Sequence, residues 1–205
     1  MTTRDHKYYQ EYGGIYFLTS TVHGWKHIFI KKSYLNLIVE TILFFQNQRK
    51  VSTIGYCIMP NHIHWLLKLD SNNNDYTKIL QTFKSYTATQ IIKILKCEIK
   101  SPEELHSQYK DNNNITLESP QRLIQYFHDQ ARQYPAQKHI FWQRDSDIKL
   151  IESEKFIRQK LNYIHNNPVQ EQWALVKEPG EYHYSSCAFY ETGRDNNGID
   201  VLNVL

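Results

Sequence analysis

The sequence predicts an α+β fold, because segments with the two-residue period of a strand alternate with segments that have the period of a helix. An apolar, β-branched run at 15–22 is followed by helical spacing at 33–48 and then by two further strands, the first at 51–59. Pro60 and Asn61 separate these two strands, and such a pair is typical of a tight turn, so the strands should form a hairpin. This order is consistent with a ferredoxin-like antiparallel sheet with helices on both faces, plus extra C-terminal helices.

The longest predicted helix covers residues 75–97. Its apolar side chains recur at three- and four-residue spacing, which is the signature of one buried helix face. These positions are Ile79, Leu80, Phe83, Thr87, Ile91, Ile94 and Leu95. Tyr86 and Gln90 lie one turn apart on a flank of that apolar arc, not on the opposite, solvated side. The helix is therefore expected to aim a phenol and an amide inward.

The second half of the chain predicts shorter elements. Residues 98–120 are polar and contain a run of asparagines, so we expect an insertion or a flexible loop there. A short amphipathic helix is predicted at 121–133, a short strand at 139–143 and a longer helix at 152–166. That last helix should stop before Pro168, since the residue that precedes a proline avoids helical backbone angles.

Composition limits the class of protein without indicating an activity. With 205 residues, the chain can bury a core as one domain over 1–205. The net charge is +3 and the pI is about 8.6, which permits binding to phosphates without requiring it. The three cysteines show neither a pairing pattern nor zinc-ligand spacing. Because no leader-like start and no apolar stretch as long as a membrane helix are found, we expect a cytoplasmic protein without membrane contact.

Two histidines two positions apart, His62 and His64, begin the third strand. Residues i and i+2 of a strand point to the same face of a sheet, so the two imidazoles should project side by side. Ile63, Trp65 and Leu67 would then cover the opposite face. Two imidazoles on one face make half of a metal site, although an isolated pair of this kind also arises by chance.

These apolar patterns together predict where Tyr86 lies. If Ile63 and its neighbours pack against the 33–48 helix, the histidines face the other side of the sheet. The 75–97 helix should then cover that side to bury its own apolar arc, which would bring Tyr86 and Gln90 to the histidines. The alternative interpretation is a boundary tyrosine that only packs its ring and leaves its hydroxyl in water.

The most specific motifs of the chain are four segments: Tyr56–Leu67, Phe83–Ala88 with Gln90, Phe141–Asp145 and Tyr163–Val169. Their residues and order resemble the single-tyrosine HUH transposases of bacterial insertion sequences, and especially their relatives, the REP-associated tyrosine transposases. The resemblance implies a tyrosine that attacks a phosphate of single-stranded DNA, and two histidines and a polar residue that bind a divalent metal. By position, the nucleophile would be Tyr86 and the metal ligands His62, His64 and Gln90.

The same resemblance implies the substrate and the cofactor. The substrate would be single-stranded DNA with a hairpin, cleaved and rejoined through a covalent phosphotyrosine intermediate, and the enzyme a monomer or a homodimer. Imidazole ligands favour metals later than magnesium in the first-row series, so either Mg²⁺ or Mn²⁺ is expected.

Four residues are candidates for contact with nucleic acid: Lys84, Trp142, Arg144 and Arg158. An exposed tryptophan can stack on a base, and arginine or lysine can bind phosphate. The pattern is equally compatible with Trp142 as a core residue and with Arg144 as the ion-pair partner of a neighbouring aspartate.

Three functions remain open from the sequence. The first is a metal-dependent transposase that nicks single-stranded DNA with Tyr86. The second is a relative that binds structured DNA or RNA without cutting it. The third is a metallohydrolase in which water attacks and Tyr86 only positions the substrate. The presence of all four predicted catalytic and metal-binding residues favours the first.

Overall fold

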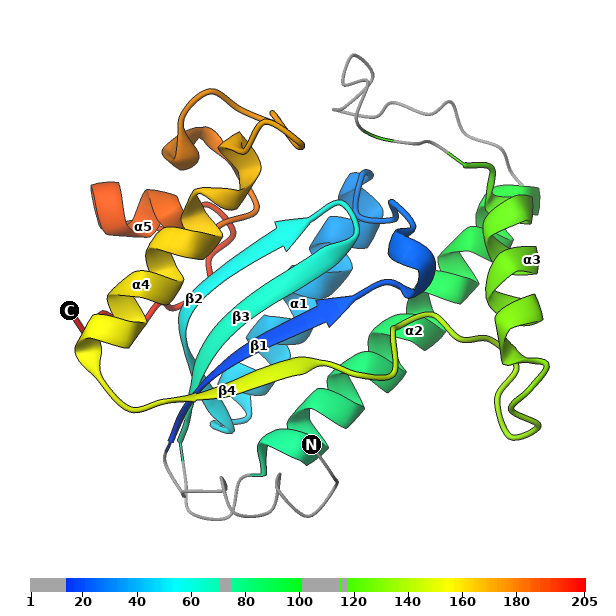
Figure 1. Ribbon diagram of the computed structural model, residues 1–205, viewed down its shortest axis with the longest axis horizontal. Helices are drawn as coiled ribbons and strands as arrows, with labels where there is room; N and C mark the ends of the chain where they lie inside the picture. Colours follow the sequence, from blue (N-terminus) through cyan, green and yellow to red (C-terminus); the bar gives the residue numbers. More distant parts are fainter. Residues whose placement is uncertain (1–13, 71–74, 101–114, 116–117) are drawn as a thin grey trace.

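The computed structural model describes residues 14–70, 75–100, 115 and 118–205. The centre of the protein is a four-stranded sheet in the order β2-β3-β1-β4, in which all neighbouring strands are antiparallel. The strands are β1 (Ile15–Thr21), β2 (Val51–Met59), β3 (His62–Leu69) and β4 (Asp147–Ile151). Helices lie on both faces of the sheet (Figure 1), so the predicted α+β, ferredoxin-like architecture is confirmed.

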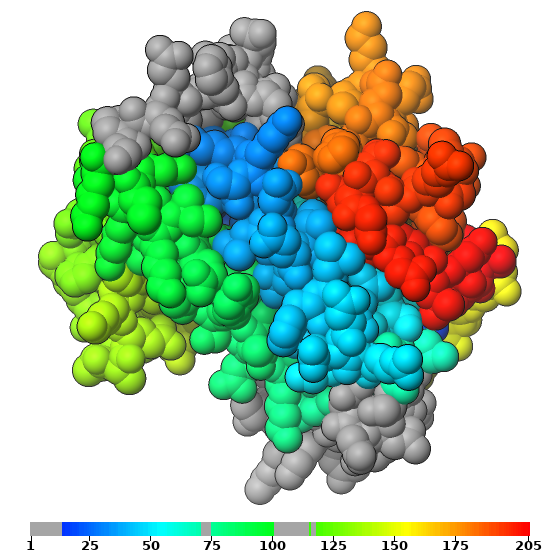
Figure 2. All heavy atoms as spheres, turned by 180° about the vertical axis from the view of Figure 1, so that it is seen from behind, coloured from blue at the N-terminus to red at the C-terminus, as the bar shows by residue number. Residues whose placement is uncertain are grey.

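Helices α1 (Lys32–Asn47) and α2 (Tyr76–Lys100) lie side by side on one face of the sheet. Trp65 of β3 contacts both: its ring centroid is 6.2 Å from that of Phe45 in α1 and 5.7 Å from that of Phe83 in α2. Figure 2, the view from behind, shows the blue atoms of α1 next to the green atoms of α2 on this face. The sequence prediction that α2 covers the face of the histidines is therefore wrong.

The handedness of strand crossovers explains why the two helices share a face. β1 and β2 are both antiparallel to β3, so they run parallel to each other, and α1 connects them. β3 and β4 also run parallel, and α2 lies on the connection between them. Crossovers between parallel strands are right-handed in nearly all proteins. The two connections start from β1 and β3, which are antiparallel neighbours, and they cross the sheet in opposite directions. Right-handed paths therefore place both helices on the same side of the sheet.

The opposite face of the sheet is covered by α4 (Glu154–His165), which lies over β2 and β3 (Figure 1). The helix is capped at its start by Ser153, whose hydroxyl accepts a hydrogen bond from the Phe156 amide. Gly55 of β2 permits its close approach, since a Cβ atom at this position would overlap Leu161 Cδ2 and come within 3.3 Å of Ser186 Oγ. The absence of a side chain at Gly55 therefore decides how closely α4 sits on the sheet.

The residues after α4 return along the outer edge of β2. The Ile58 amide donates to the Tyr184 carbonyl at 2.9 Å, and the Ser186 amide donates to the Tyr56 carbonyl at 3.0 Å. The elements of this segment are the 3-10 helices η3 (Asn167–Val169) and η4 (Pro179–Glu181) and the helix α5 (Cys187–Thr192). The edge of β2 is thereby paired with the chain itself, and the extra C-terminal helices are confirmed.

Two elements of the second half differ from the sequence prediction. β4, which completes the sheet beside β1, has no counterpart among the predicted elements. The strand expected at 139–143 contributes only an isolated bridge between Val22 and Trp142. Both differences have one cause: the segment between α3 (Pro120–Ala131) and α4 pairs with the edge of β1, and edge pairing is not visible in local periodicity.

Other boundaries agree with the prediction or shift slightly. The helix expected at 121–133 is confirmed as α3 (Pro120–Ala131). α2 continues to Lys100, so the insertion expected at 98–120 begins later, and most of its remaining residues lie outside the described part of the chain. Among the described residues, no helix is long and apolar enough to cross a membrane.

Gly55→Ala should lower the free energy of unfolding by about 1–3 kcal/mol, because the added methyl group overpacks the contact between β2 and α4. In a Leu161→Ala background the same substitution should have a much smaller effect, since the methyl group then enters the space vacated by leucine. Urea unfolding of the wild type, both single variants and the double variant measures this difference. Equal effects of Gly55→Ala in both backgrounds would show that α4 does not press on Gly55.

Candidate active site around His62 and His64

His62 and His64 project from β3 onto the face of the sheet opposite α1 and α2. Their Nε2 atoms are 3.1 Å apart, and their ring centroids are 4.7 Å apart. The side chains are buried, with 7% and 2% of their surface exposed. The prediction that two imidazoles project side by side is confirmed, and we call these two residues the histidine pair.

The hydrogen bonds of Asn61 determine which nitrogen of His62 carries the proton. Asn61 donates through Nδ2 to the Trp25 carbonyl at 3.3 Å, so its Oδ1 is the atom that faces His62. This oxygen lies 2.6 Å from His62 Nδ1 and can only accept a hydrogen bond. In the neutral ring the proton therefore resides on Nδ1, which leaves the Nε2 lone pair free.

His64 is oriented by residues from two other elements. Thr19, its direct partner across the β1–β3 ladder, places Oγ1 3.0 Å from His64 Nδ1. Asn167, at the start of η3, donates from Nδ2 to His64 Nε2 at 2.9 Å. Because Nε2 accepts this hydrogen bond, the proton of the neutral ring lies on Nδ1 and is donated to Thr19.

Two unprotonated nitrogens thus face each other across 3.1 Å. With no proton between them, the two nitrogens gain no hydrogen bond from each other, and a cation could take the place of the proton. Two nitrogen ligands on adjacent positions of one ion are roughly 3 Å apart, since metal–nitrogen bonds are about 2.0–2.1 Å long. Hydrogen bonds to the second ring nitrogen, like those of Asn61 and Thr19, orient histidines in metal sites. The geometry and the donor types of the histidine pair fit a divalent metal.

Burial keeps both imidazoles neutral near pH 7. It lowers the pKa of His62 to about 4. Burial also holds the pKa of His64 well below its ordinary value, and the neighbouring His62 and Lys160 lower it further. The neutral ring is the form that binds metal, because a protonated nitrogen has no lone pair to offer. Within the described residues, no group of three or more His, Cys, Asp or Glu is placed to hold a metal.

Tyr86 and Gln90 do not reach the histidine pair within one chain. They lie on α2, on the other side of the sheet, and no hydrogen bond joins them to the pair in the described part of the chain. Lys84 donates to the Gln143 carbonyl at 2.6 Å, close to where β4 begins. Lys84 and Tyr86 are two positions apart in the sequence, which is about 200° around a helix. Tyr86 therefore points away from the Lys84 contact, and it exposes 50% of its surface. The expected convergence is therefore wrong for a single chain.

Residues of α4 and of the segment after it surround the histidine pair instead. The ring centroid of Tyr163 is 5.2 Å from that of His64, and the Lys160 ammonium is 5.7 Å from the Tyr163 ring. Trp173 lies over His62 with the ring centroids 5.9 Å apart. Tyr163 exposes 47% of its surface and forms the side of the site that faces solvent. Of these residues, the sequence indicated only Tyr163, because it belongs to one of the four family-like motifs.

Two of the predicted contacts to nucleic acid are engaged inside the protein. Trp142 is buried, and its Nε1 donates to the Lys84 carbonyl and to the Thr87 hydroxyl at 3.1 Å each. Trp142 cannot stack on a base from this position, so its interpretation as a core residue is correct. The Lys84 ammonium donates to the carbonyl of Gln143 and to the hydroxyl of Ser146, and burial lowers its pKa to about 8.

The two predicted arginines are on the surface. Arg144 is exposed, and its guanidinium lies 4.3 Å from the centroid of the Tyr134 ring. Arg158 is exposed on α4, one turn after Glu154, with which it forms an ion pair at 2.6 Å. Both guanidinium groups are accessible to phosphate, and their contact with DNA stays a prediction.

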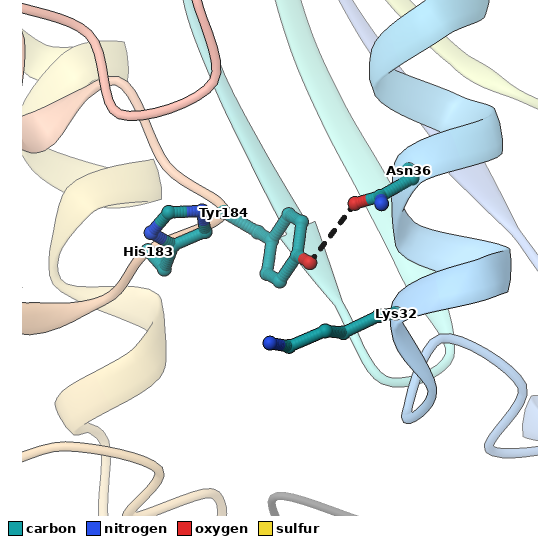
Figure 3. A pocket seen from close by; sticks show the side chains of 4 residues that line it. All are labelled: Lys32, Asn36, His183 and Tyr184. Atoms are coloured by element: carbon teal, nitrogen blue, oxygen red, sulfur yellow. Dashed lines mark hydrogen bonds between the residues drawn. The ribbon is translucent and has the colours of Figure 1, made fainter.

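A separate hollow of about 350 Å³ lies between α1 and the C-terminal segment. Lys32, Asn36, His183 and Tyr184 line it, and the Tyr184 hydroxyl donates to Asn36 Oδ1 at 3.1 Å (Figure 3). None of the predicted site residues lines this hollow. It is therefore distinct from the site around the histidine pair.

Asn61→Ala should release the tautomer of His62, because the acceptor that holds the proton on Nδ1 is lost. Nitrogen-15 NMR of the imidazoles should show wild-type His62 protonated on Nδ1 at pH 7, and a mixture of tautomers or the Nε2 form in the variant. Affinity for Mn²⁺ should fall about 10–100-fold, as for other residues that orient ligands. Asn166→Ala, at an exposed asparagine, serves as the control. A wild-type His62 that is protonated on Nε2 would contradict the assignment.

Comparison with known proteins shows which family this chain resembles. Residues 21–130 match the family model described as "Transposase IS200 like". The chain is 24% identical over 174 residues to a REP-associated tyrosine transposase of Haemophilus influenzae, covering 83% of this chain and 78% of that protein. It also resembles the solved structure of a REP-associated tyrosine transposase bound to a REP hairpin. The TM-score is 0.57 with 16% identity, covering 94% of this chain and 87% of the other. Since the family model spans more than half of its length, the chain belongs to the IS200-like transposase family.

Proposed function

We propose that this transposase cleaves and rejoins single-stranded DNA at hairpin-bearing sites through a covalent linkage to Tyr86, with a divalent metal held by His62 and His64. The observation that supports the metal is the pair of buried, unprotonated nitrogens 3.1 Å apart. The hairpin is suggested by the related transposase, whose structure contains a REP hairpin. The Tyr86 assignment rests on the family-like motif around it.

Neutral ligands suit this chemistry. A Mg²⁺ or Mn²⁺ ion bound to the histidine pair would supply positive charge to the non-bridging oxygens of the scissile phosphodiester. Because the two imidazoles carry no charge, they leave that positive charge uncompensated. Thr19 and Asn61 accept from Nδ1 of the two rings, so the Nε2 atoms are the ones offered to a metal. An Asp or Glu ligand would reduce the positive charge offered to the phosphate.

Tyr86 supplies the nucleophile in this mechanism. Its phenol oxygen bonds to phosphorus as the bond from phosphorus to the departing strand end breaks, and the proton lost by the phenol is balanced by the one that the departing oxygen takes up from water to leave as a hydroxyl. The phosphodiester energy is retained in the new phosphotyrosine, so a DNA hydroxyl can later attack it and release the tyrosine. The reaction is therefore reversible and allows strand transfer.

A second copy of the chain is the simplest source of this tyrosine. Within one chain, α2 would have to leave the sheet to bring Tyr86 to the histidine pair. Such a movement would expose Tyr76, Phe83 and Ile91, which are buried in the core. Exposing each of these side chains costs about 1.5–3 kcal/mol. Tyr86 of a neighbouring copy is already exposed and needs no such rearrangement, and Gln90, one turn later, would accompany it.

Tyr86→Phe should eliminate the covalent protein–DNA adduct while leaving the fold intact. The side chain is half exposed, so loss of the hydroxyl should change stability by less than about 1 kcal/mol. A labelled single strand with a hairpin, incubated with Mn²⁺ and separated on a denaturing gel, should give a protein-linked band only with the wild type. Mass spectrometry of the digested adduct should identify the peptide that contains Tyr86.

Other outcomes of this experiment point to different functions. Nicking by Tyr86→Phe at the wild-type rate would indicate a metallohydrolase that uses water. Binding without any cleavage by the wild type would indicate a non-cleaving relative. An adduct mapped to Tyr163, which lies beside His64 in the same chain, would make the α4 tyrosine the nucleophile.

Mixing two inactive variants distinguishes a nucleophile from the same chain from one supplied by a second copy. His64→Ala lacks the histidine pair, and Tyr86→Phe lacks the nucleophile. If Tyr86 acts on the partner's histidine pair, a mixed dimer contains one complete site, so the mixture should recover up to about a quarter of the wild-type cleavage. Gel quantification of cleaved strand measures the recovery. A mixture as inactive as either variant alone would mean that the two residues act within one chain.

A further inference from the structure

We propose that the exposed indole of Trp25 is a stacking platform for one unpaired base of the DNA strand, next to the phosphodiester that is cleaved at the histidine pair. This inference rests on the function proposed above and deepens it, because it says how the protein holds the strand beside the reacting bond. It assigns a contact to nucleic acid that lies outside the four family-like motifs.

Among the four tryptophans, all of which lie in the described part of the chain, only Trp25 is open to solvent. It exposes 60% of its surface, whereas Trp65, Trp142 and Trp173 are buried. The bases of a single strand stack on exposed aromatic rings, and this stacking tolerates any sequence because every base has a π-face. Trp25 therefore offers the type of surface that an unpaired base requires.

The backbone at Trp25 has a conformation that large side chains avoid. Gly24 has a φ of 63° and Trp25 a φ of 57°, so two successive residues lie in the left-handed region. Gly24 adopts this conformation freely, and a Cβ atom at its position would overlap the Tyr126 hydroxyl. For Trp25 the same conformation is unfavourable. Because the ring is mostly exposed, its packing does little to offset that cost, and strained residues of this kind gather at functional sites.

Hydrogen bonds tie the loop that carries Trp25 to the turn before the histidine pair. The Trp25 carbonyl accepts from Asn61 Nδ2 at 3.3 Å, and Oδ1 of the same amide lies 2.6 Å from His62 Nδ1. The Val22 amide donates to the Asn61 carbonyl at 2.8 Å. One asparagine side chain therefore joins the backbone of Trp25 to the first histidine of the pair.

The same loop also borders the site through His27. The ring centroid of His27 is 5.7 Å from that of Trp173, whose ring lies over His62. The loop thus contacts the surroundings of the histidine pair at two points, Asn61 and Trp173. A strand with one phosphate at the histidine pair has its neighbouring nucleotides beside this loop.

The loop is better suited to a base than to a phosphate. Its lysine, Lys26, forms an ion pair with Glu118 at 2.8 Å, and its ammonium lies 4.6 Å from the centroid of the Tyr126 ring. This positive charge is engaged inside the protein. What the loop presents to solvent is the flat, uncharged ring of Trp25.

The test follows the tryptophan fluorescence of the full chain during titration with a single strand that carries a hairpin and unpaired flanks. EDTA is present, so binding is measured without metal and without cleavage. Because Trp25 is the exposed tryptophan, its long-wavelength emission should be quenched when a base stacks on it. Trp25→Phe should lose this quenching and keep its affinity within about threefold of the wild type, since a phenyl ring also stacks.

Two further variants separate stacking from apolar contact. Trp25→Ala should weaken binding about 5–150-fold, which corresponds to the loss of one stacked base. Trp25→Leu should lose nearly as much, because leucine keeps an apolar side chain without a π-face. Phe44→Ala is the control: Phe44 exposes 52% of its surface on α1, across the sheet from the histidine pair, and its loss should change affinity less than twofold. Affinity of Trp25→Ala within twofold of the wild type would overturn the inference.

A second measurement changes the DNA instead of the protein, in case Trp25→Ala does not fold. Abasic sites are placed one at a time along the unpaired flanks of the strand. At one position the missing base should weaken binding to the wild type and abolish the quenching of Trp25. In Trp25→Ala the same abasic site should cause no further loss, since both changes remove one contact. Quenching that survives at every abasic position would contradict base stacking.

Another occupant of the ring would also be detected. If the emission of Trp25 shifts to shorter wavelength as protein concentration rises without DNA, a second copy of the chain covers the ring, and the inference is wrong.

Failure of this inference is distinguishable from failure of the proposed function. If the wild type forms the covalent adduct with Mn²⁺ but Trp25→Ala binds the strand within twofold of the wild type, the function stands and only the role of Trp25 is wrong. If the strand quenches Trp25 but no adduct or cleavage follows, the stacking stands and the proposed cleavage is wrong. A wild type that does not bind the strand overturns both.

Discussion

The alternation of side chains along β3 divides the molecule into two halves with different chemistry. Trp65 points to one face of the sheet and packs against both α1 and α2. His62 and His64 point to the other face, where polar side chains from β1 and from the segment after α4 meet them. A shift of β3 by one residue would turn Trp65 out of the core, so core packing fixes the face on which the histidine pair lies.

Burial of two imidazoles is unfavourable unless their polar atoms have partners. Asn61, Thr19 and Asn167 provide these partners, and together they leave both Nε2 atoms without protons. The result is a neutral site in which two unprotonated nitrogens lie 3.1 Å apart. A divalent cation is a ligand partner that such a pair of nitrogens suits. The hydrogen bonds of Asn61 and Thr19 therefore satisfy the metal-free site and also orient both rings for a metal.

Family membership and the position of α2 together explain why the proposed nucleophile is exposed. The chain is an IS200-like transposase, yet Tyr86 and the histidine pair lie on opposite sides of one sheet. On the proposed mechanism, the tyrosine meets the metal site only when two copies assemble. α4, with Tyr163 at the solvent-facing edge, occupies the face that α2 was expected to cover.

The sequence by itself determined the local structure, because hydrophobic periodicity reports whether a segment is a strand or a helix and which of its side chains share a face. The strands on either side of Pro60 and the common face of His62 and His64 follow from that information alone. The face on which α2 packs depends on crossover handedness, and the pairing of β4 depends on a free edge of β1. Asn167 reaches His64 across 103 positions of the chain. Only the tertiary structure could decide these features, because each one depends on where a distant segment lies, and no local pattern encodes that position.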